Sequence, residues 1–402
     1  MEIYKKISSI DFRENINGYI DLLVLTYYIS QYDYNNRDKY LKILDEEIIS
    51  LLKSLNKYEY RIIGCEGSLL EILYLIDSFD NSNSYQNLKL QMFDCIAYYL
   101  DIYLKTVPPL YTPAFYDLIS GITSLGNYLI INSTQNKNFI KNEIMLQLIS
   151  DKFISMFNTK EKGLAALDNF CVHIESEDSS VPYKSLDLGL SHGLLGPLVF
   201  MSKLYRKNED KKLLEAIECG LAVYEQYRSI EDDIPNFPTS ISYYTNKIVV
   251  TRKERMSWCY GNIGVLRGIH LINENLNKSN KELIKYIRKI SALDSEEWRL
   301  ICPTFCHGKS GMLTILNEFN REHPHSNLVE GINVLTKEIW ECYSSKYIYG
   351  FPKKERDYFS DTLLTLENDI SVIGGIGSIL IAYIRTMVPI ENDFLSSMLL
   401  VN

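Results

Sequence analysis

One short motif recurs along this chain and limits what the chain can fold into. Gly-x-x-Gly occurs five times, and a sixth copy has serine in the second position. The copies are Gly64/Gly67, Gly121/Ser124, Gly193/Gly196, Gly261/Gly264, Gly308/Gly311 and Gly374/Gly377. An apolar run follows each copy, as at residues 68–76 and 127–131, which predicts a helix buried over most of its surface. A motif repeated between helices is typical of a repeat architecture.

Amphipathic segments separate these apolar runs. Ile140, Ile144 and Leu148, with Met145 and Ile149, follow the three-and-four spacing of a one-sided apolar stripe, as does the segment 283–290. Buried and half-exposed helices therefore alternate, at uneven intervals. Closed into a ring, such hairpins give an all-α fold, an α/α toroid with inner and outer helix rings and small β or loop insertions. The glycine turns would then converge at one end of the barrel.

Glycines in a single copy of the motif are explained by helix packing or a positive φ. Six copies, three with Cys or His beside the glycine, favour a shared site instead. We expect one toroid domain over residues 1–402, with a loop and β insertion at about 229–251, where Pro235 and Pro238 precede an alternating run. The segment 171–184 has a similar pattern. Both insertions either wall the site or are surface excursions.

Composition narrows the class of protein. The chain is 46% hydrophobic and 23% charged with a net charge of −9, so it can build a large core. Without clustered Lys and Arg it is predicted to bind neither nucleic acid nor an anionic membrane surface. The apolar run 21–29 begins at Asp21 and is too short to cross a bilayer, which predicts a buried helix. Eight scattered Cys indicate no disulfide framework and predict a cytoplasmic protein.

Two cysteines and a histidine are the first candidates for metal ligands. Cys259, Cys306 and His307 lie in two glycine turns and are donors that suit Zn²⁺. Three protein ligands leave the fourth position open, as in catalytic zinc sites. Cys302 is an alternative fourth ligand, although Pro303 predicts an extended entry that directs it away. His192, beside Gly193, is either a fourth ligand or an acid-base group.

Other polar residues near the turns are weaker candidates. Asp117 and Arg255 each lie four residues before a turn residue, and Tyr260 follows Cys259; from the residues alone, solvated or capping roles explain the first two. The remaining histidines are expected to be structural or exposed, and the remaining cysteines to be buried thiols. These are His173, His270, His323 and His325, and Cys65, Cys95, Cys171, Cys219 and Cys342.

Together the turns resemble a known family. Ser257-Trp258-Cys259-Tyr260-Gly261, Phe305-Cys306-His307-Gly308 and Ser191-His192-Gly193 resemble the signature turns of the lanthionine synthetase C-like family, the lanthipeptide cyclases. Asp117 to Gly121 looks like the family's second turn, with Ser124 as a departure. The resemblance covers residues from about 60 to 380, and the first 60 residues resemble nothing specific.

The resemblance implies an α/α toroid with one Zn²⁺ per chain on Cys259, Cys306 and His307. It implies a carbon–sulfur bond-forming cyclase of the lyase class that acts in lantibiotic biosynthesis. Zinc would activate a precursor Cys thiol for Michael-type addition to dehydroalanine or dehydrobutyrine, forming (methyl)lanthionine thioether rings. His192, oriented by Asp117, would transfer the proton. Arg255 would support the developing charge. Tyr260 would have a positioning role or donate a proton.

The same resemblance implies partners. These are a dehydrated precursor peptide as substrate, a separate dehydratase and a peptide exporter, with recruitment to the inner face of the membrane through them and no direct insertion. Two alternatives stay open: a prenyltransferase-like zinc enzyme, which needs a basic diphosphate pocket, and a non-catalytic zinc protein that binds a thiol such as glutathione. A zinc hydrolase is disfavoured because no His-Glu-x-x-His motif is present.

Overall fold

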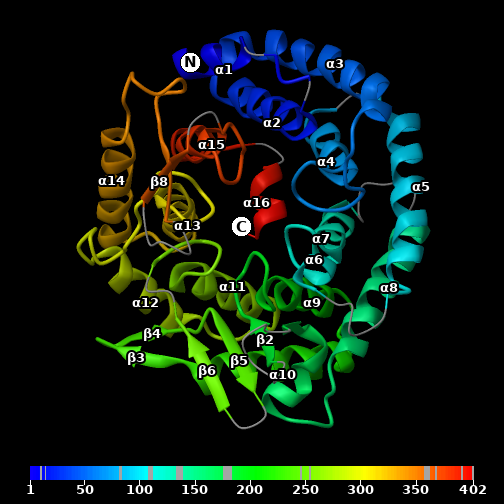
Figure 1. The fold of residues 1–402 in the computed structure, drawn as a ribbon, viewed down its shortest axis with the longest axis vertical. Coiled ribbons are helices and arrows are strands. Elements are labelled where there is room, and N and C mark those ends of the chain that lie inside the picture. Colours follow the sequence, from blue (N-terminus) through cyan, green and yellow to red (C-terminus); the bar gives the residue numbers. More distant parts are fainter. Residues whose placement is uncertain are drawn as a thin grey trace.

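The structure, a computed structural model, describes residues 1–9, 11–13, 15–80, 84–106, 112–132, 139–174, 183–244, 247–252, 255–356, 363–366, 369–390 and 393–400. Its helices form two concentric rings, which confirms the predicted α/α toroid (Figure 1). The inner ring comprises α2 (Ile16–Tyr32), α4 (Leu69–Phe79), α7 (Ile122–Asn132), α9 (Leu195–Asn208), α11 (Asn262–Asn275), α13 (Lys309–Glu322) and α15 (Ile376–Met387). The outer ring comprises α3 (Arg37–Ser54), α5 (Gln86–Tyr103), α8 (Phe139–Met156), α10 (Lys211–Tyr227), α12 (Lys281–Ser291) and α14 (Ser326–Glu341). The short helices are α1 (Glu2–Ser8), α6 (Pro113–Tyr116) and α16 (Phe394–Leu399), with 3₁₀ turns at Tyr34–Asn36, Leu55–Lys57 and Gly163–Phe170.

The N-terminal helices belong to the ring, although no glycine turn precedes them. Helix α2 packs against α3, α4 and α15 and thereby closes the inner ring. Asn15 caps α2 by accepting a hydrogen bond from the Asn17 amide, and the run from residue 21 to 29 is almost entirely buried as predicted. A family resemblance limited to residues 60–380 was therefore too narrow, because α2 enters the ring without the motif that marks the other inner helices.

Helices α7, α9, α11, α13 and α15 each begin within a copy of the glycine motif, and α4 begins two residues after its copy. The first copy illustrates the local cause. Ser68 accepts a hydrogen bond from the Glu71 amide at 2.9 Å, and the Glu71 carboxylate accepts one from the Gly67 amide at 2.7 Å. This reciprocal arrangement resembles a capping box and fixes where α4 starts.

The motif glycines mainly provide space. Of these glycines, only Gly64 and Gly67 have a positive φ. At Gly264 an added Cβ would lie 1.9 Å from the Trp258 carbonyl oxygen, a distance that no side chain tolerates. Inner helices can therefore begin directly against the loop that precedes them, which brings the loop residues to the rim of the barrel.

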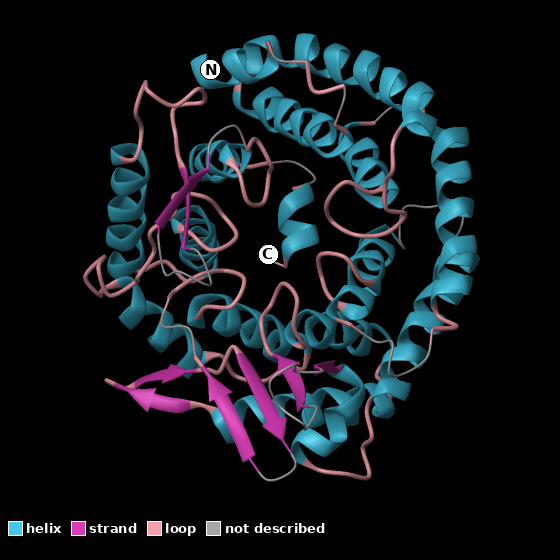
Figure 2. Ribbon diagram, viewed as in Figure 1, coloured by secondary structure: helices cyan, strands magenta, loops and turns pink. Residues whose placement is uncertain are grey.

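Small antiparallel sheets lie at two places: most strands are at the bottom of the ring in Figure 2, and one hairpin lies apart from them at the left. The largest has the order β1 (Cys171–Ile174), β2 (Tyr183–Asp187), β5 (Ser240–Tyr244) and β6 (Lys247–Thr251); β3 (Ser229–Glu231) pairs with β4 (Ile234–Asn236), and β7 (Lys353–Arg356) with β8 (Leu363–Leu366). Strands thus occur in both segments where the sequence departs from helical patterns, whereas the β7/β8 hairpin was not predicted. Strand β2 ends at Asp187, paired with Ser240, and the chain then enters the glycine turn of His192.

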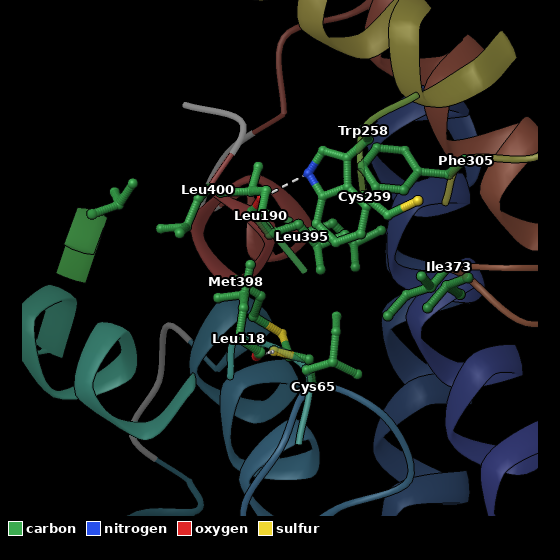
Figure 3. Packing of buried hydrophobic residues seen from close by; sticks show 14 of the residues in the cluster. Cys65, Leu118, Leu190, Trp258, Cys259, Phe305, Ile373, Leu395, Met398 and Leu400 are labelled. Carbon is green, nitrogen blue, oxygen red and sulfur yellow. Dashed lines mark hydrogen bonds between the residues drawn. The ribbon is translucent and has the colours of Figure 1, made fainter. Parts of the chain in front are cut away.

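The C-terminal helix fills the middle of the ring. Helix α16 lies inside the inner helices in Figure 1, and its Met398 side chain is fully buried. The indole nitrogen of Trp258 donates a hydrogen bond to the Leu399 carbonyl at 3.1 Å (Figure 3). The Trp258 ring also packs on Phe305, with centroids 4.9 Å apart. The C-terminal end of the chain therefore packs against the turns before α11 and α13 and supports them.

Two expectations about side-chain burial were wrong. Helix α8 forms as predicted, but Ile140, Ile144 and Leu148 are 76%, 55% and 43% exposed. Met145 and Ile149 lie on the buried side instead, because two stripes of α8 share the same spacing and packing against α7 and α10 selects one of them. Cys95 is exposed on α5. None of the helices in the described ranges combines the length and apolar character needed to cross a bilayer.

Candidate active site

Backbone hydrogen bonds join each glycine turn to the next around the rim. Five of them run from amide to carbonyl: Cys65 to Ile119, Leu118 to Ser191, Leu190 to Cys259, Cys259 to Cys306, and Cys306 to Ile373, at 2.6 to 3.1 Å. The Val372 amide donates to the Asp21 carboxylate at 3.0 Å, which links the last turn to α2. The turns are therefore held in a circle, and the residues between their glycines are fixed relative to one another.

Two adjacent turns bring together Cys259, Cys306 and His307, which we call the Cys/His cluster. One ligand atom from each lies within 4.8 Å of the other two, a spacing that a shared zinc ion spans with bonds of roughly 2.0–2.3 Å. Cys259 precedes α11 and the other two precede α13, and these inner helices pack side by side. Two thiols and an imidazole are donors that zinc prefers, so the residues present fit this ion.

The two thiols differ in their affinity for protons. Burial raises the pKa of Cys259, but a hydrogen bond with Cys306, the charge of Arg255 and hydrogen bonds from Ser257 and the Tyr260 backbone outweigh it and bring that pKa to about 6. The same bond between the thiols, together with burial, raises the pKa of Cys306. The pair thus shares one proton. Metal ligands must lose such a proton on binding, and the lowered pKa of Cys259 favours that loss.

His192 and Asp117 form a hydrogen-bonded pair beside this cluster. The His192 Nδ1 atom lies 2.7 Å from Asp117 Oδ2. The other Asp117 oxygen accepts the amides of Ser120 and Gly121, so the carboxylate is an acceptor throughout. His192 therefore carries its proton on Nδ1 when neutral, and its other nitrogen is available to the cavity, because the side chain is 41% exposed whereas that of Asp117 is 1% exposed.

The charge around His192 favours its protonated form. Burial lowers the pKa of His192, but the hydrogen bond to Asp117 and the negative charges of Asp117, Asp187 and Cys259 outweigh it, and the pKa is raised. The shift from the ordinary value of about 6.5 therefore favours the protonated imidazole. Such a group can donate a proton and regain it.

Arg255 and Tyr260 flank the cluster on the same turn as Cys259. The positive charge of Arg255 lowers the pKa of both Cys259 and Cys306, and its buried Nε has no hydrogen-bond partner among the described residues. The Tyr260 hydroxyl donates a hydrogen bond to Asp187 at 2.9 Å. Both residues thus lie close to the thiols, and their roles stay predictions.

A cavity of about 520 Å³ opens onto these groups. Its lining includes His192, Cys306 and His307. It also includes residues of α2, of β7 and of the segments next to the first and last turns, among them Asp21, Arg61, Glu66, Lys353 and Asp369. Proton donor and metal-type ligands therefore share one cavity.

Comparisons with known proteins identify the family of this chain. A family model described as lanthionine synthetase C-like protein matches residues 16–400. The chain belongs to the lanthionine synthetase C-like family. The nisin biosynthesis protein NisC of Lactococcus lactis subsp. lactis is 24% identical over 344 residues, which cover 79% of this chain and 77% of NisC.

A solved structure of nisin cyclase is similar to the whole ring. It matches with a TM-score of 0.75 at 16% identity and covers 95% of this chain and 90% of the cyclase, which supports the toroid. An α-1,6-mannanase of Salegentibacter sp. matches with a TM-score of only 0.45 at 10% identity, over 83% of this chain and 88% of the mannanase, and carries no argument.

The other Cys and His candidates of this lanthionine synthetase C-like protein lie elsewhere. The Cys302 thiol is 3.0 Å from the Thr304 hydroxyl and outside the Cys/His cluster. His325 caps α14 by accepting the Asn327 amide, and the side chain of His173 lies outside the described residues. His270 is buried in α11, and His323 follows the end of α13.

A second group with metal-type ligands lies between the middle of α11 and the C-terminal end of α13. His270, Glu322 and His323 are within ligand spacing, but Arg267 lies among them, and we call the four residues the Arg267 cluster. The Arg267 guanidinium donates two hydrogen bonds of 2.7 Å to Glu322 and approaches His270 Nδ1 at 3.4 Å. A positive charge therefore already neutralises this carboxylate, and we read the group as a buried ion-pair network.

Sequence reasoning missed Asp187. It lies five residues before His192, at the end of a strand where an aspartate is unremarkable, and nothing in the sequence links it to Tyr260, 73 positions away. A polar residue just before a catalytic turn was the only available signal. The contact with Tyr260 exists only because the sheet and the α11 turn meet at the rim.

Proposed function

We propose that residues 1–402 form a single zinc-dependent lanthipeptide cyclase domain of the carbon–sulfur lyase class. In this proposal a cysteine thiol of a precursor peptide adds to a dehydroalanine or dehydrobutyrine of the same peptide, forming a thioether ring. The observation that carries the proposal is one cavity that presents His192, Cys306 and His307 together, with Asp117 directly behind the imidazole.

Cys259, Cys306 and His307 would hold the zinc ion. Zinc bound there would lower the pKa of a coordinating substrate thiol and keep it as a nucleophilic thiolate at neutral pH. Arg255 favours the thiolate forms of the two ligand cysteines, which supports metal binding. Cys302 takes no part in this arrangement, since its thiol is directed to Thr304.

His192 would supply the proton that the addition needs. Attack on the β-carbon forms the carbon–sulfur bond, breaks the carbon–carbon π bond and leaves negative charge on the α-carbon and the adjacent amide oxygen. Protonated His192 faces the cavity and can deliver its proton to the α-carbon. Asp117 holds Nδ1 and stabilises the imidazolium before transfer, which explains why its carboxylate is buried and fully hydrogen-bonded.

The cavity argues against a diphosphate substrate. Prenyl transfer needs several cations near the thiol that are free to bind a diphosphate, whereas Lys353 in this cavity is paired with Asp369 at 2.8 Å, Arg61 donates a hydrogen bond to Ser120, and Glu66 contributes a further carboxyl group. A simple thiol-binding protein needs no oriented acid-base pair. The His192–Asp117 pair therefore favours catalysis over either alternative.

The reaction implies other proteins. A dehydratase must first convert Ser or Thr of the precursor to the dehydroamino acid, and we propose that it is a separate partner, together with a peptide exporter. A cytoplasmic location with recruitment to the membrane through these partners stays a prediction from the sequence.

One assay tests the proposal. The zinc-loaded protein is incubated with a dehydrated peptide that contains one cysteine, and free thiol is measured with an alkylating reagent. Cyclisation is an isomerisation, so thiol should disappear while the peptide mass stays constant. Parallel incubations with prenyl diphosphate plus peptide, and with glutathione, separate the alternatives: a mass increase on the peptide, or glutathione binding without loss of peptide thiol, would reject the proposal.

A further inference from the structure

We infer that Asp187 is a positioning residue that locks Tyr260 and fixes the turn of His192 against the turn of Cys259. The inference rests on the proposed function, because it concerns how a constant distance is kept between the proton donor and the metal ligands. Asp187 ends β2 and is assigned no role by the family signature turns.

The contact between Asp187 and Tyr260 is specific. Asp187 Oδ2 accepts the Tyr260 hydroxyl at 2.9 Å, and Oδ1 accepts the Gly189 amide at 2.9 Å. The Tyr260 ring lies directly on Gly189, where an added Cβ would be 2.5 Å from a ring carbon. The ring is thus held at its hydroxyl by a carboxylate and on one face by bare backbone.

The same loop binds the Cys259 turn and carries His192. The Leu190 amide donates to the Cys259 carbonyl at 2.8 Å, and the Leu194 amide donates to the Asp187 carbonyl at 2.9 Å. Residues 187–194 therefore form a closed loop, with His192 inside it and Cys259 bonded to it. Loss of the carboxylate would release Tyr260 and let the loop shift relative to the metal ligands.

This geometry also decides what Tyr260 can do. A carboxylate only accepts hydrogen bonds, so the phenol proton is directed to Asp187 and away from the cavity. Tyr260 therefore acts through its position and not as a proton donor to the substrate. Removing its hydroxyl should then reproduce the part of the Asp187 effect that passes through Tyr260, since the bond from the Gly189 amide to Asp187 Oδ1 remains.

The test is a double-mutant cycle with Asp187→Ala, Tyr260→Phe and both together, in the zinc-loaded full-length protein. Kinetics with a dehydrated peptide, zinc content and the thermal midpoint are measured for each. Removing such outer contacts typically lowers activity by about 10–100-fold. We expect that loss in kcat for each single variant, an unchanged KM, an unchanged zinc content and no further loss in the double variant.

A matched control lies on the same sheet. Tyr243 of β5 donates its hydroxyl to Asp168 at 2.9 Å, which is a second phenol–carboxylate pair away from the cavity lining. Tyr243→Phe should leave kcat and KM at wild-type values. If it lowers kcat as much as Tyr260→Phe does, the effect is general weakening of the sheet and the inference fails.

Two further outcomes are decisive. Independent, additive losses from Asp187→Ala and Tyr260→Phe would show that Tyr260 acts on the substrate by itself, and would overturn the inference while cyclisation by the wild type still stands. A wild-type protein that forms no thioether would instead reject the proposed function.

Discussion

Two groups of metal-type ligands lie along helices α11 and α13, and they differ in kind. The Cys/His cluster lies just before the N-termini of both helices, and the Arg267 cluster joins the middle of α11 to the C-terminal end of α13. Each helix has 14 residues, or roughly 21 Å of length, so the clusters are separate sites. Both bring three ligand-type residues to the same spacing.

The two clusters differ in the charge that already lies among their ligand-type residues. In the Arg267 cluster a fully buried guanidinium makes two 2.7 Å bonds with Glu322 and stacks over the Phe319 ring at 4.8 Å. In the Cys/His cluster the thiols share a proton, which a metal can replace. Ligand type and spacing are therefore insufficient to identify a metal site. Whether a positively charged side chain already pairs with the ligands must also be considered.

The largest expected effect separates the clusters by metal content. Cys306→Ala removes one of three ligands and should cost more than the about 100-fold in zinc affinity that outer-shell changes cost, with loss of cyclisation. His323→Ala, the control at the far end, should bind zinc as the wild type does. Zinc measured per chain after dialysis checks both. Equal zinc loss in the two variants would contradict the distinction.

The next effect concerns chemistry without loss of metal. His192→Ala should lower the cyclisation rate by about 10²–10⁴-fold, the usual contribution of a general acid, while zinc content stays constant because His192 lies outside the ligand group. Single-turnover thioether formation measures this. His325→Ala, at the cap of α14, provides the control and should react normally. An unchanged rate in His192→Ala would refute its proton-transfer role.

The free energy of unfolding should depend on the Arg267 cluster. Arg267→Ala leaves Glu322 unpaired and should lower the free energy of unfolding by roughly 3 kcal/mol, the low end for a broken buried pair, because the Glu322 side chain is 30% exposed. Urea denaturation measures it, with zinc content unchanged. Lys337→Ala breaks a surface pair with Glu341 and should cost about 0.5 kcal/mol. Similar losses in the two variants would contradict the ion-pair reading.

A smaller effect is a pH dependence of stability from His270. Burial and then the charge of Arg267 lower its pKa to about 4, whereas the unfolded value is about 6.5. Between these values the unfolded chain binds the extra proton, so His270 should reduce stability as pH falls from 6.5 to 4 and have no such effect above 6.5. Denaturation of wild type and His270→Gln compared at pH 7 and pH 5 isolates this contribution. A constant difference between the two would disprove it.

The smallest expected effect tests the boundary of the Cys/His cluster. Cys302→Ala should leave zinc stoichiometry and cyclisation unchanged, because its thiol contacts Thr304. A fall in bound zinc would make Cys302 a fourth ligand and close the position proposed for the substrate.

Helix starts, helical pattern and the types of candidate ligand depend on local chemistry and can be predicted from the sequence. The glycine copies mark the starts of six inner helices, because a Cβ at a position such as Gly264 would collide with the preceding loop in any fold that places a helix there. Helical pattern and donor type likewise need no distant partner, so the all-α class and the candidate ligands Cys259, Cys306 and His307 follow from the order of residues.

Contacts between surfaces and charges that are far apart in the sequence depend on the tertiary structure. The two apolar stripes of α8 are equivalent until α7 and α10 cover one of them, which left Ile140 exposed. The membership of α2 in the ring depends on Asp21 meeting Val372. The contacts of Asp187 with Tyr260 and of Arg267 with Glu322 join residues 73 and 55 positions apart. Closing the ring creates such pairs, and no local pattern encodes them.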